Sequence, residues 1–228
     1  MRARLLIMLI GTSACGPSTP PGTHQGKAYF TQAGCAACHK IGSQGSAVGP
    51  DLTLIGWRQT SQWLDLWLQD PQAWKPDTLM PNPRLPPAAR QAIVTYLSER
   101  QGQDWAQGER PWDAPALSKN PVARGRVIFA RAGCIGCHGA DGSGGFPNRH
   151  AKGGVIPRLD RVAEGYSKTE LIEKIRTGVS SPQAENPHGP APMIRMPAWK
   201  EKLDASELDA VASFLLELSS SKMEKMGW

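Results

Sequence analysis

A fourteen-residue segment occurs twice in this chain, 99 residues apart, and this repeat constrains the fold more than any other feature. Residues 26–39 read GKAYFTQAGCAACH and residues 125–138 read GRVIFARAGCIGCH, with seven of the fourteen positions identical. Self-similarity at a fixed offset indicates that one structural unit is used more than once. Two copies in 228 residues therefore predict two small domains of related structure.

Each copy is followed, at its end, by a pattern typical of an amphipathic helix. The apolar residues that share one face at helical spacing are Ala89, Ala92, Ile93, Tyr96 and Leu97 in the first copy and Leu208, Val211, Ala212, Leu215 and Leu218 in the second. Pro86 and Pro87 predict the start of the first helix, and Asp204 with Glu207 predicts a capping box at the start of the second.

Residues 100–120 are rich in Gly, Pro, Gln and Asp, show no periodicity, and predict an irregular linker. We therefore expect all-helical domains at 26–99 and 121–219 and a C-terminal tail at 220–228. With 24 Gly and 20 Pro the loops should be long, and alternating strand patterns are scarce, which argues against a β-sandwich or barrel. Beyond the N-terminus no apolar stretch approaches the roughly 18–20 residues that span a bilayer, which excludes a multi-pass membrane protein.

The N-terminus has the pattern of a secretory signal peptide, predicted at 1–14: a basic start, an apolar run and small residues. A buried N-terminal helix is the alternative, but the sequence GPSTPP that follows Cys15 would stop it. The residues before Cys15 resemble the lipobox of bacterial lipoproteins, although Thr12 stands where Leu is usual. The resemblance implies that Cys15 carries a lipid and that residues 15–25 form a tether.

An exported chain anchored in this way would lie in the periplasm or on the outer face of the cytoplasmic membrane. Ordinary cleavage nearby, with Cys15 free or removed, remains the alternative. Removing Arg2 and Arg4 with the signal lowers the formal charge from +6 to +4. Since no Lys/Arg run or basic-aromatic pattern occurs, nucleic acid is not an expected partner.

Each repeat carries a Cys-x-x-Cys-His motif, at Cys35, Cys38 and His39 and again at Cys134, Cys137 and His138. Two thiols three residues apart on a helical turn reach the two vinyl groups of one haem and form thioethers. The histidine that follows then points its imidazole at the iron from the same side. The sequence thus predicts two covalently attached haem c groups, with His39 and His138 as axial ligands.

Three other uses of such motifs fit less well. A zinc site needs two more Cys or His ligands per motif, whereas the remaining histidines are only His24, His150 and His188. A thioredoxin-like pair would follow a strand in a βαβ unit, which the pattern lacks. A structural disulfide is the third alternative, and the occurrence of two such motifs, in a repeat, in a chain expected to be exported favours haem c over all three.

Residues 70–80, DPQAWKPDTLM, resemble the Asn-Pro-x-x-Tyr-x-Pro-Gly-Thr-x-Met segment of the class I cytochrome c family. Pro71, Pro76, Thr78 and Met80 match in place, and Trp74 stands at the aromatic position. The resemblance implies two tandem class I cytochrome c domains, with Met80 as the second axial ligand of the first iron. A lone methionine is otherwise most often core filler, but a loop flanked by Pro76 and Pro81 is a poor place for one.

The sequence leaves the second axial ligand in the second domain less certain than in the first. Met196-Pro-Ala-Trp199 resembles the Met-Pro-x-aromatic segment of the same family and implies Met196 as the second axial ligand. Met193, His188 and His150 remain alternatives because the loops at 139–158 and 180–195 are long.

Further correspondences follow from the resemblance. Gly26 and Phe30 should cross the last helix near Tyr96, as should Gly125 and Phe129 near Phe214. The carbonyls of Pro50 and Pro157 should accept the proximal imidazole N–H and so strengthen the histidine as a donor. Tryptophans that would either wall the haem edges or pack in the core are Trp57, Trp63, Trp67, Trp74 and Trp199.

The resemblance implies an electron carrier. Iron bound by His and Met has no open position for substrate, and thioether sulfur favours the ferrous state. Such a protein would pass single electrons from a quinol-oxidising complex or a dehydrogenase to a terminal oxidase or reductase. A dihaem enzyme that reduces peroxide or oxidises sulfur compounds is the alternative, with His150, His188 or Glu185 near an open second haem; redox or gas sensing has no supporting segment.

Overall fold

The structure, a computed structural model, describes residues 22–105 and 110–225, with side chains described as far as residue 221. The expected signal peptide and Cys15 lie outside the described residues. Helices joined by irregular segments, with one short hairpin, make up the described chain, and this confirms the all-α expectation. None of its helices combines the length and the apolar character that a bilayer crossing requires.

The elements of the first domain are α1 (Thr23–Gln32), η1 (Cys35–Ala37), β1 (Lys40–Ile41), β2 (Gln44–Gly45), α2 (Ile55–Arg58), α3 (Ser61–Gln69), α4 (Pro71–Trp74) and α5 (Pro87–Ser98). Local signals explain their starts. The side chains of Thr60 and Asp70 cap α3 and α4, and Pro87 stands in the first turn of α5, where its missing N–H costs nothing. Residues 23–25 of the expected tether belong to α1.

The second domain contains η2 (Pro115–Leu117), α6 (Pro121–Arg131), α7 (Ile135–His138), η3 (Val162–Glu164), α8 (Lys168–Thr177), η4 (Trp199–Glu201) and α9 (Ala205–Lys225). Asn120 caps α6, and Ser167 with Glu170 forms a capping box on α8. The predicted capping box of α9 is confirmed, since the Asp204 and Glu207 side chains each accept the other's backbone N–H at 2.9 Å.

Helix α9 runs past Leu218, into the segment expected as a tail. No Pro or Gly interrupts the chain before Gly227, so nothing local stops the helix. Ser219 is fully buried, and its Oγ accepts a hydrogen bond from the Ala163 N–H at 3.2 Å. The helix therefore extends as far as this contact with η3 and beyond.

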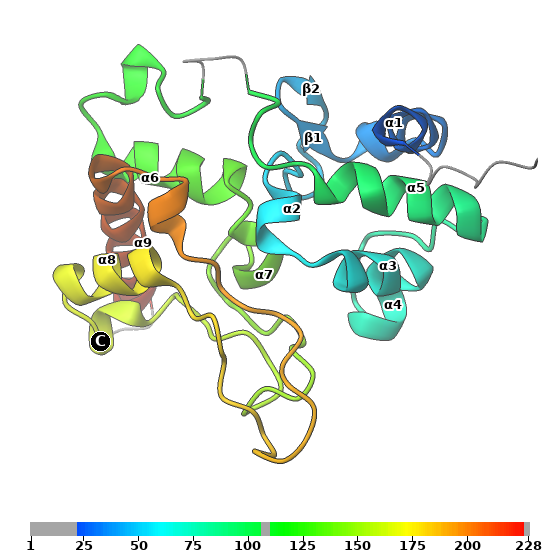
Figure 1. The fold of residues 1–228 in the computed structure, drawn as a ribbon. Coiled ribbons are helices and arrows are strands. Elements are labelled where there is room, and N and C mark those ends of the chain that lie inside the picture. The colour runs from blue at the N-terminus through cyan, green and yellow to red at the C-terminus, as the bar shows by residue number, and fades with distance from the viewer. Residues whose placement is uncertain (1–21, 106–109, 226–228) are drawn as a thin grey trace, which may run out of the picture.

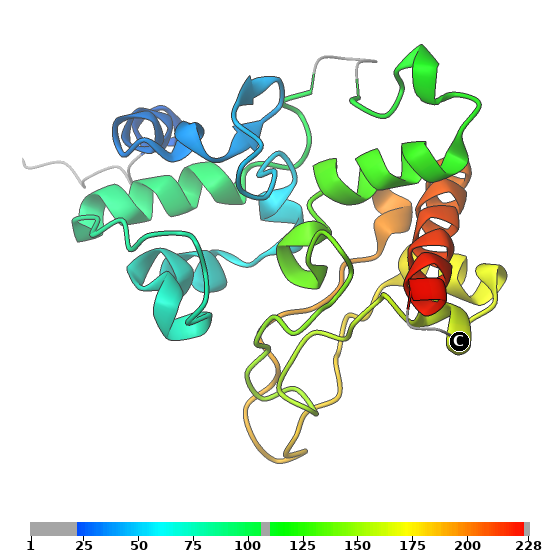
Figure 2. The ribbon, with the colours of Figure 1, turned by 180° about the vertical axis from the view of Figure 1, so that it is seen from behind.

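In each domain the first and last helices cross at a glycine (Figures 1 and 2). A Cβ at Gly26 would overlap the Ala92 carbonyl of α5, and one at Gly125 would overlap the Ala210 carbonyl of α9. Beside these crossings Phe30 packs on Tyr96 at 5.7 Å between ring centroids, and Phe129 on Phe214 at 5.5 Å. The expected crossings are confirmed in both copies.

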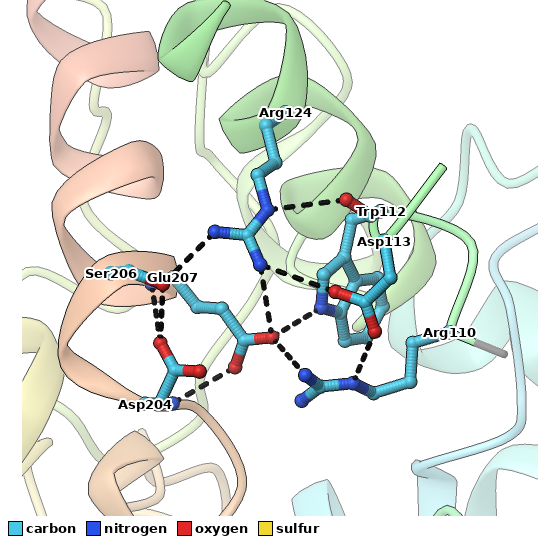
Figure 3. A network of polar contacts seen from close by, with 7 residues as sticks. All are labelled: Arg110, Trp112, Asp113, Arg124, Asp204, Ser206 and Glu207. Carbon is cyan, nitrogen blue, oxygen red and sulfur yellow. Dashed lines mark hydrogen bonds and ion pairs between the residues drawn. The ribbon is translucent and has the colours of Figure 1, made fainter. Parts of the chain in front are cut away.

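The described residues between α5 and α6 contain one short 3-10 helix, η2, and part of this segment is anchored to the second domain. Trp112 is buried, packs edge-on against Trp105 with ring centroids 4.9 Å apart, and donates from Nε1 to Glu207 at 2.6 Å. Figure 3 shows Arg110 and Arg124 converging on the same carboxylate, which is fully buried. Since a buried carboxylate needs such partners, this network holds the end of the linker on α9.

The two domains share a packed boundary. Phe146, Ile156 and Ile194 of the second domain belong to the buried cluster of the first, and Leu54 of the first belongs to that of the second. Arg131 of α6 pairs with Asp51 at 2.6 Å across this boundary. The loops at 139–158 and 180–195, which project together below α7 in Figure 1, thus pack partly against the first domain.

We expect Gly125→Ala to destabilise the protein, because the added Cβ meets the backbone of α9 and the two helices must separate. Overpacking of this kind costs about 1–3 kcal/mol. The free energy of unfolding in denaturant measures the loss. Gly165→Ala is the matched control, since no atom lies within 4 Å of a Cβ there and φ is −129°; an equal loss in both variants would contradict the expectation.

Candidate haem sites

The first motif lies on the turn that follows α1. Gly34 takes φ 71° there, which only glycine adopts without cost, and the chain then turns through η1. Cys35 is half-buried and Cys38 is exposed. The Nδ1 atom of His39 lies 2.8 Å from the Pro50 carbonyl oxygen, so the imidazole is oriented as the resemblance implied.

Met80 lies in the loop between α4 and α5. Its sulfur accepts a hydrogen bond from Trp67 Nε1 at 3.0 Å, and Trp67 stacks on Trp63 with centroids 5.2 Å apart. Met80 and Cys35 pack against the same buried cluster. The fold therefore gathers the predicted sulfur ligand and the motif around one apolar centre, while the ligation itself stays a prediction.

The second motif opens onto a cavity of about 500 Å³. Cys134, Cys137, His138 and Met196 all line it, from α7 and from the segment before η4. Its other walls are largely apolar, and they include Phe129, Ile156, Leu171, Ile175, Trp199, Val211 and Leu215. A planar, mostly apolar group attached to the two thiols fits such a space.

The imidazole of His138 is held by the predicted carbonyl, with Nδ1 at 3.2 Å from the Pro157 oxygen. Burial lowers the pKa of His138, while the bond to Pro157 opposes that shift. The ring is therefore neutral at neutral pH, and a neutral ring that donates from Nδ1 keeps the lone pair of Nε2 for a metal. Burial also raises the pKa of Cys134 to about 12 and raises that of Cys137.

Among the candidates for the second axial position, Met196 is the one whose side chain reaches this cavity. Backbone hydrogen bonds with Val179, at 2.8 and 3.2 Å, fix its place. Met193 packs instead against the buried cluster of the first domain, and His150 and His188 are exposed and outside the cavity lining. These placements favour Met196.

Charged side chains at the cavity are all cationic. Those in its lining are Arg58, Lys152, Arg158, Lys174 and Arg195, and the lining contains no Asp or Glu. The buried Nε of Arg58 has no hydrogen-bond partner in the described structure. The same is true of the buried Nε1 of Trp63, near the first motif. Because a haem carries two carboxylates on an apolar plane, these cations and donors suit it.

The competing readings of the motifs find no support in the described residues. Neither pair of motif cysteines is joined by a disulfide in the described structure. Within 22–105 and 110–225, no three or more His, Cys, Asp or Glu side chains gather as a metal-binding group. A zinc site would need such a group, whereas a porphyrin supplies four ligands of its own.

The five tryptophans expected either at the haem edges or in the core differ in their surroundings, and Trp63 is a buried residue that stacks on Trp67. Trp199 lines the second cavity, and Trp67 contacts Met80. Trp74 lies at the domain boundary, where the Arg149 guanidinium is 3.9 Å from its ring. Trp57 packs against the second-domain cluster, under Lys202.

The sequence pattern missed several residues of the site. Arg58 and Gln59 belong to the first domain yet line the second cavity, and Asn148 connects the two long loops. Phe146, which packs on Trp63 and Trp67, lies in the long 139–158 loop, where no periodic pattern predicts burial. Its bulky apolar side chain within a Gly-rich segment was the one available signal.

A comparison with protein families now identifies the chain. The cytochrome c family model matches residues 24–101 and again 122–219, and the chain belongs to that family. Its two matched regions contain one motif each.

Two curated relatives are subunits of oxidases. The chain is 23% identical over 203 residues to the Cbb3-type cytochrome c oxidase subunit CcoP of an Azospirillum strain, covering 86% of this chain and 62% of that protein. It is 31% identical over 83 residues to cytochrome c oxidase subunit 2 of Alkalihalophilus pseudofirmus, covering 32% of this chain and 24% of that protein. The chain thus spans less than two thirds of either relative. No solved structure matches it.

We expect Asn148→Asp to loosen the loop wall of the second cavity. Asn148 is buried, donates to the Ile194 carbonyl at 2.9 Å and accepts from the Ile194 N–H at 3.1 Å. An aspartate keeps the shape but loses the donor, at a cost of about 1–3 kcal/mol. Limited proteolysis should cut the 180–195 loop faster.

Asn186→Asp is the control for that measurement, because Asn186 only accepts, from the His188 N–H at 3.0 Å, and aspartate accepts equally well. Unchanged proteolysis of the Asn148 variant would mean that this pair does not hold the loops.

Proposed function

We propose that this protein is a dihaem electron-transfer cytochrome. One haem c would be held by thioethers to Cys35 and Cys38, with His39 and Met80 binding its iron. The other would be held by Cys134 and Cys137, with His138 and Met196 binding its iron. The observation that carries the proposal is the apolar cavity of the second domain, whose lining brings together both thiols, the oriented imidazole and the thioether.

Haem c, when bound, supplies a one-electron ferric–ferrous couple. The chain does the rest. The carbonyls of Pro50 and Pro157 orient the two histidines and increase their donor strength. The apolar walls exclude water, and methionine sulfur favours the ferrous form, so both features raise the reduction potential.

An iron held by His on one side and Met on the other would leave no position for substrate, which is what an electron carrier requires. The enzymatic alternative needs an acid–base side chain beside an open iron. The three candidates for that role are exposed and lie outside the cavity lining: His150, His188 and Glu185. Their placement favours the carrier.

We propose that the acceptor is a terminal oxidase, in line with the two oxidase subunits that the chain resembles. The donor would be a quinol-oxidising complex or a periplasmic dehydrogenase. The protein would act on the outer face of the cytoplasmic membrane, anchored through a lipid on Cys15. Electrons would pass between the two haems across the packed domain boundary, where Phe146 lies 5.7 Å from Trp67 between ring centroids.

Met80→Ala and Met196→Ala should each remove the sulfur-to-iron absorption band of one ferric haem and lower the potential of that haem. The physical reason is the loss of the thioether that stabilises the ferrous form. A ferric spectrum and a redox titration measure both effects, and Met193→Ala serves as the control, since its side chain lies outside the second cavity.

Two low-spin haems that do not respond to peroxide would support the carrier. A high-spin haem that reacts with peroxide in the unaltered protein would contradict it, and an unchanged band in Met196→Ala would contradict that ligand.

Cys15→Ser should move the protein from the membrane fraction into the soluble fraction, because a lipidated cysteine would no longer be present. Fractionation of the producing cells, followed by haem staining, measures this. Ser13→Ala, in the same segment, is the control. Persistent membrane association of the Cys15 variant would mean that something other than this lipid holds the protein.

A further inference from the structure

Arg58 is the last residue of α2 in the first domain, but its guanidinium lies at the haem-attachment turn of the second. The side chain is 7% exposed and lines the second cavity. The guanidinium donates from Nη1 to the Gly133 carbonyl at 2.9 Å and from Nη2 to the Asp51 carbonyl at 2.8 Å. Gly133 directly precedes Cys134.

The turn is shaped to receive this guanidinium. Gly133 takes φ 86°, and a Cβ there would lie 2.5 Å from Arg58 Cζ. At Gly136, inside the motif, a Cβ would lie 3.4 Å from Nη1. A side chain at Gly133 would therefore displace the arginine from the motif. The neighbouring Gln59 contacts the same turn, with its amide nitrogen 3.8 Å from the Cys137 sulfur.

The charge of Arg58 is not balanced locally. Its two hydrogen bonds go to neutral carbonyls, and its buried Nε has no partner among the described residues. The nearest carboxylate, Asp51, is 4% exposed and is already paired with Arg131 at 2.6 Å. Asp51 thus balances Arg131, which leaves the buried guanidinium of Arg58 without an ion-pair partner among the described residues.

A buried unpaired charge is costly, unless a negative charge that enters the site offsets it. Both Cys134 and Cys137 lie within electrostatic reach of Arg58, which opposes the rise in their pKa caused by burial. The first motif is in a different position, since no hydrogen bond joins Arg58 to residues 35–39 in the described structure. Arg58 contacts the second motif directly, through its hydrogen bond to Gly133, so the second site is where we expect its charge to have the larger effect.

We propose that Arg58 is a positioning residue of the second haem, supplied by the first domain, and that its charge raises the reduction potential of that haem. The inference rests on the proposed function, because it requires a haem on Cys134 and Cys137. Reduction adds one negative charge to the haem, and a fixed cation in a poorly solvated wall stabilises the reduced form. The second haem is thus tuned by the domain that packs against it.

The test is a spectroelectrochemical titration of the full-length dihaem protein in four variants. Arg58→Met removes the charge and keeps much of the volume. Arg58→Lys keeps the charge but loses the planar guanidinium, which bonds Gly133 and Asp51 at the same time. Asp51→Asn increases the net charge of the cluster while keeping the acceptor for Thr53. Arg90→Met is the control, because Arg90 is half-buried and balanced by Asp65 at 2.8 Å.

For Arg58→Met we expect the ratio of reduced to oxidised second haem, at a fixed ambient potential, to fall about tenfold, which is about 59 mV for a one-electron couple. Arg58→Lys should stay within about threefold of the unaltered protein, as expected when charge rather than shape dominates. Asp51→Asn should shift the second couple in the opposite direction. The control should leave it unchanged.

Equal shifts in Arg58→Met and Arg58→Lys, or equal shifts of both haems, would overturn the inference. If Arg58→Met fails to incorporate the second haem while Arg58→Lys retains it, the positioning role is supported. The sign of the Asp51→Asn shift then decides the role of the charge.

The two proposals fail in distinguishable ways. Haem staining and a pyridine haemochrome assay that gave fewer than two haems per unaltered chain would contradict the proposed function. If the unaltered chain carries two haems but the reduction potential of the second is the same in Arg58→Met and Asp51→Asn as in the unaltered protein, this inference alone is contradicted.

Discussion

Contact between residues 51–59 of the first domain and the turn bearing Cys134 and Cys137 determines how the two candidate sites lie. Arg58 donates to Gly133, and Arg131 reaches back to Asp51 and to the Gly42 carbonyl. These bonds are buried or half-buried, where breaking one leaves a polar group without water to replace its partner. The apolar contacts of Phe146 and Ile156 form around them.

The same motif is used twice in different surroundings. In the first copy Pro50 follows His39 after 11 residues, and Cys38 remains exposed. In the second, Pro157 follows His138 after 19 residues, and the longer loop turns back over the cavity. The second pair of thiols is consequently more buried, as the raised pKa of Cys134 reflects. Equal attachment chemistry is therefore compatible with two unequal redox environments.

An electron carrier of this family requires three things of its fold. These are iron ligands held in place, an apolar lining that keeps water away from the haem, and a haem edge that is exposed or close to the other haem. The carbonyls of Pro50 and Pro157 and the apolar lining of the second cavity meet the first two needs. The stacked rings of Trp63 and Trp67, with Phe146 against both, lie where the two domains meet. The end of the linker is held on α9 by the contacts of Arg110 and Trp112 with the buried Glu207 carboxylate.

The sequence by itself determined the duplicated all-α architecture and the capping box at Asp204, because periodicity, spacing and capping chemistry are local. The crossings at Gly26 and Gly125 and the Pro50 and Pro157 contacts were implied by the resemblance of the repeats to the cytochrome c family. The ligation by Met80 and Met196 stays a prediction. Only the tertiary structure decided that Arg58 reaches the second motif, that Phe146 is buried rather than solvated, and that Met196 rather than Met193 lines the cavity. Those facts depend on how two domains pack, and packing between residues some 75 or more apart leaves no periodic trace in the chain.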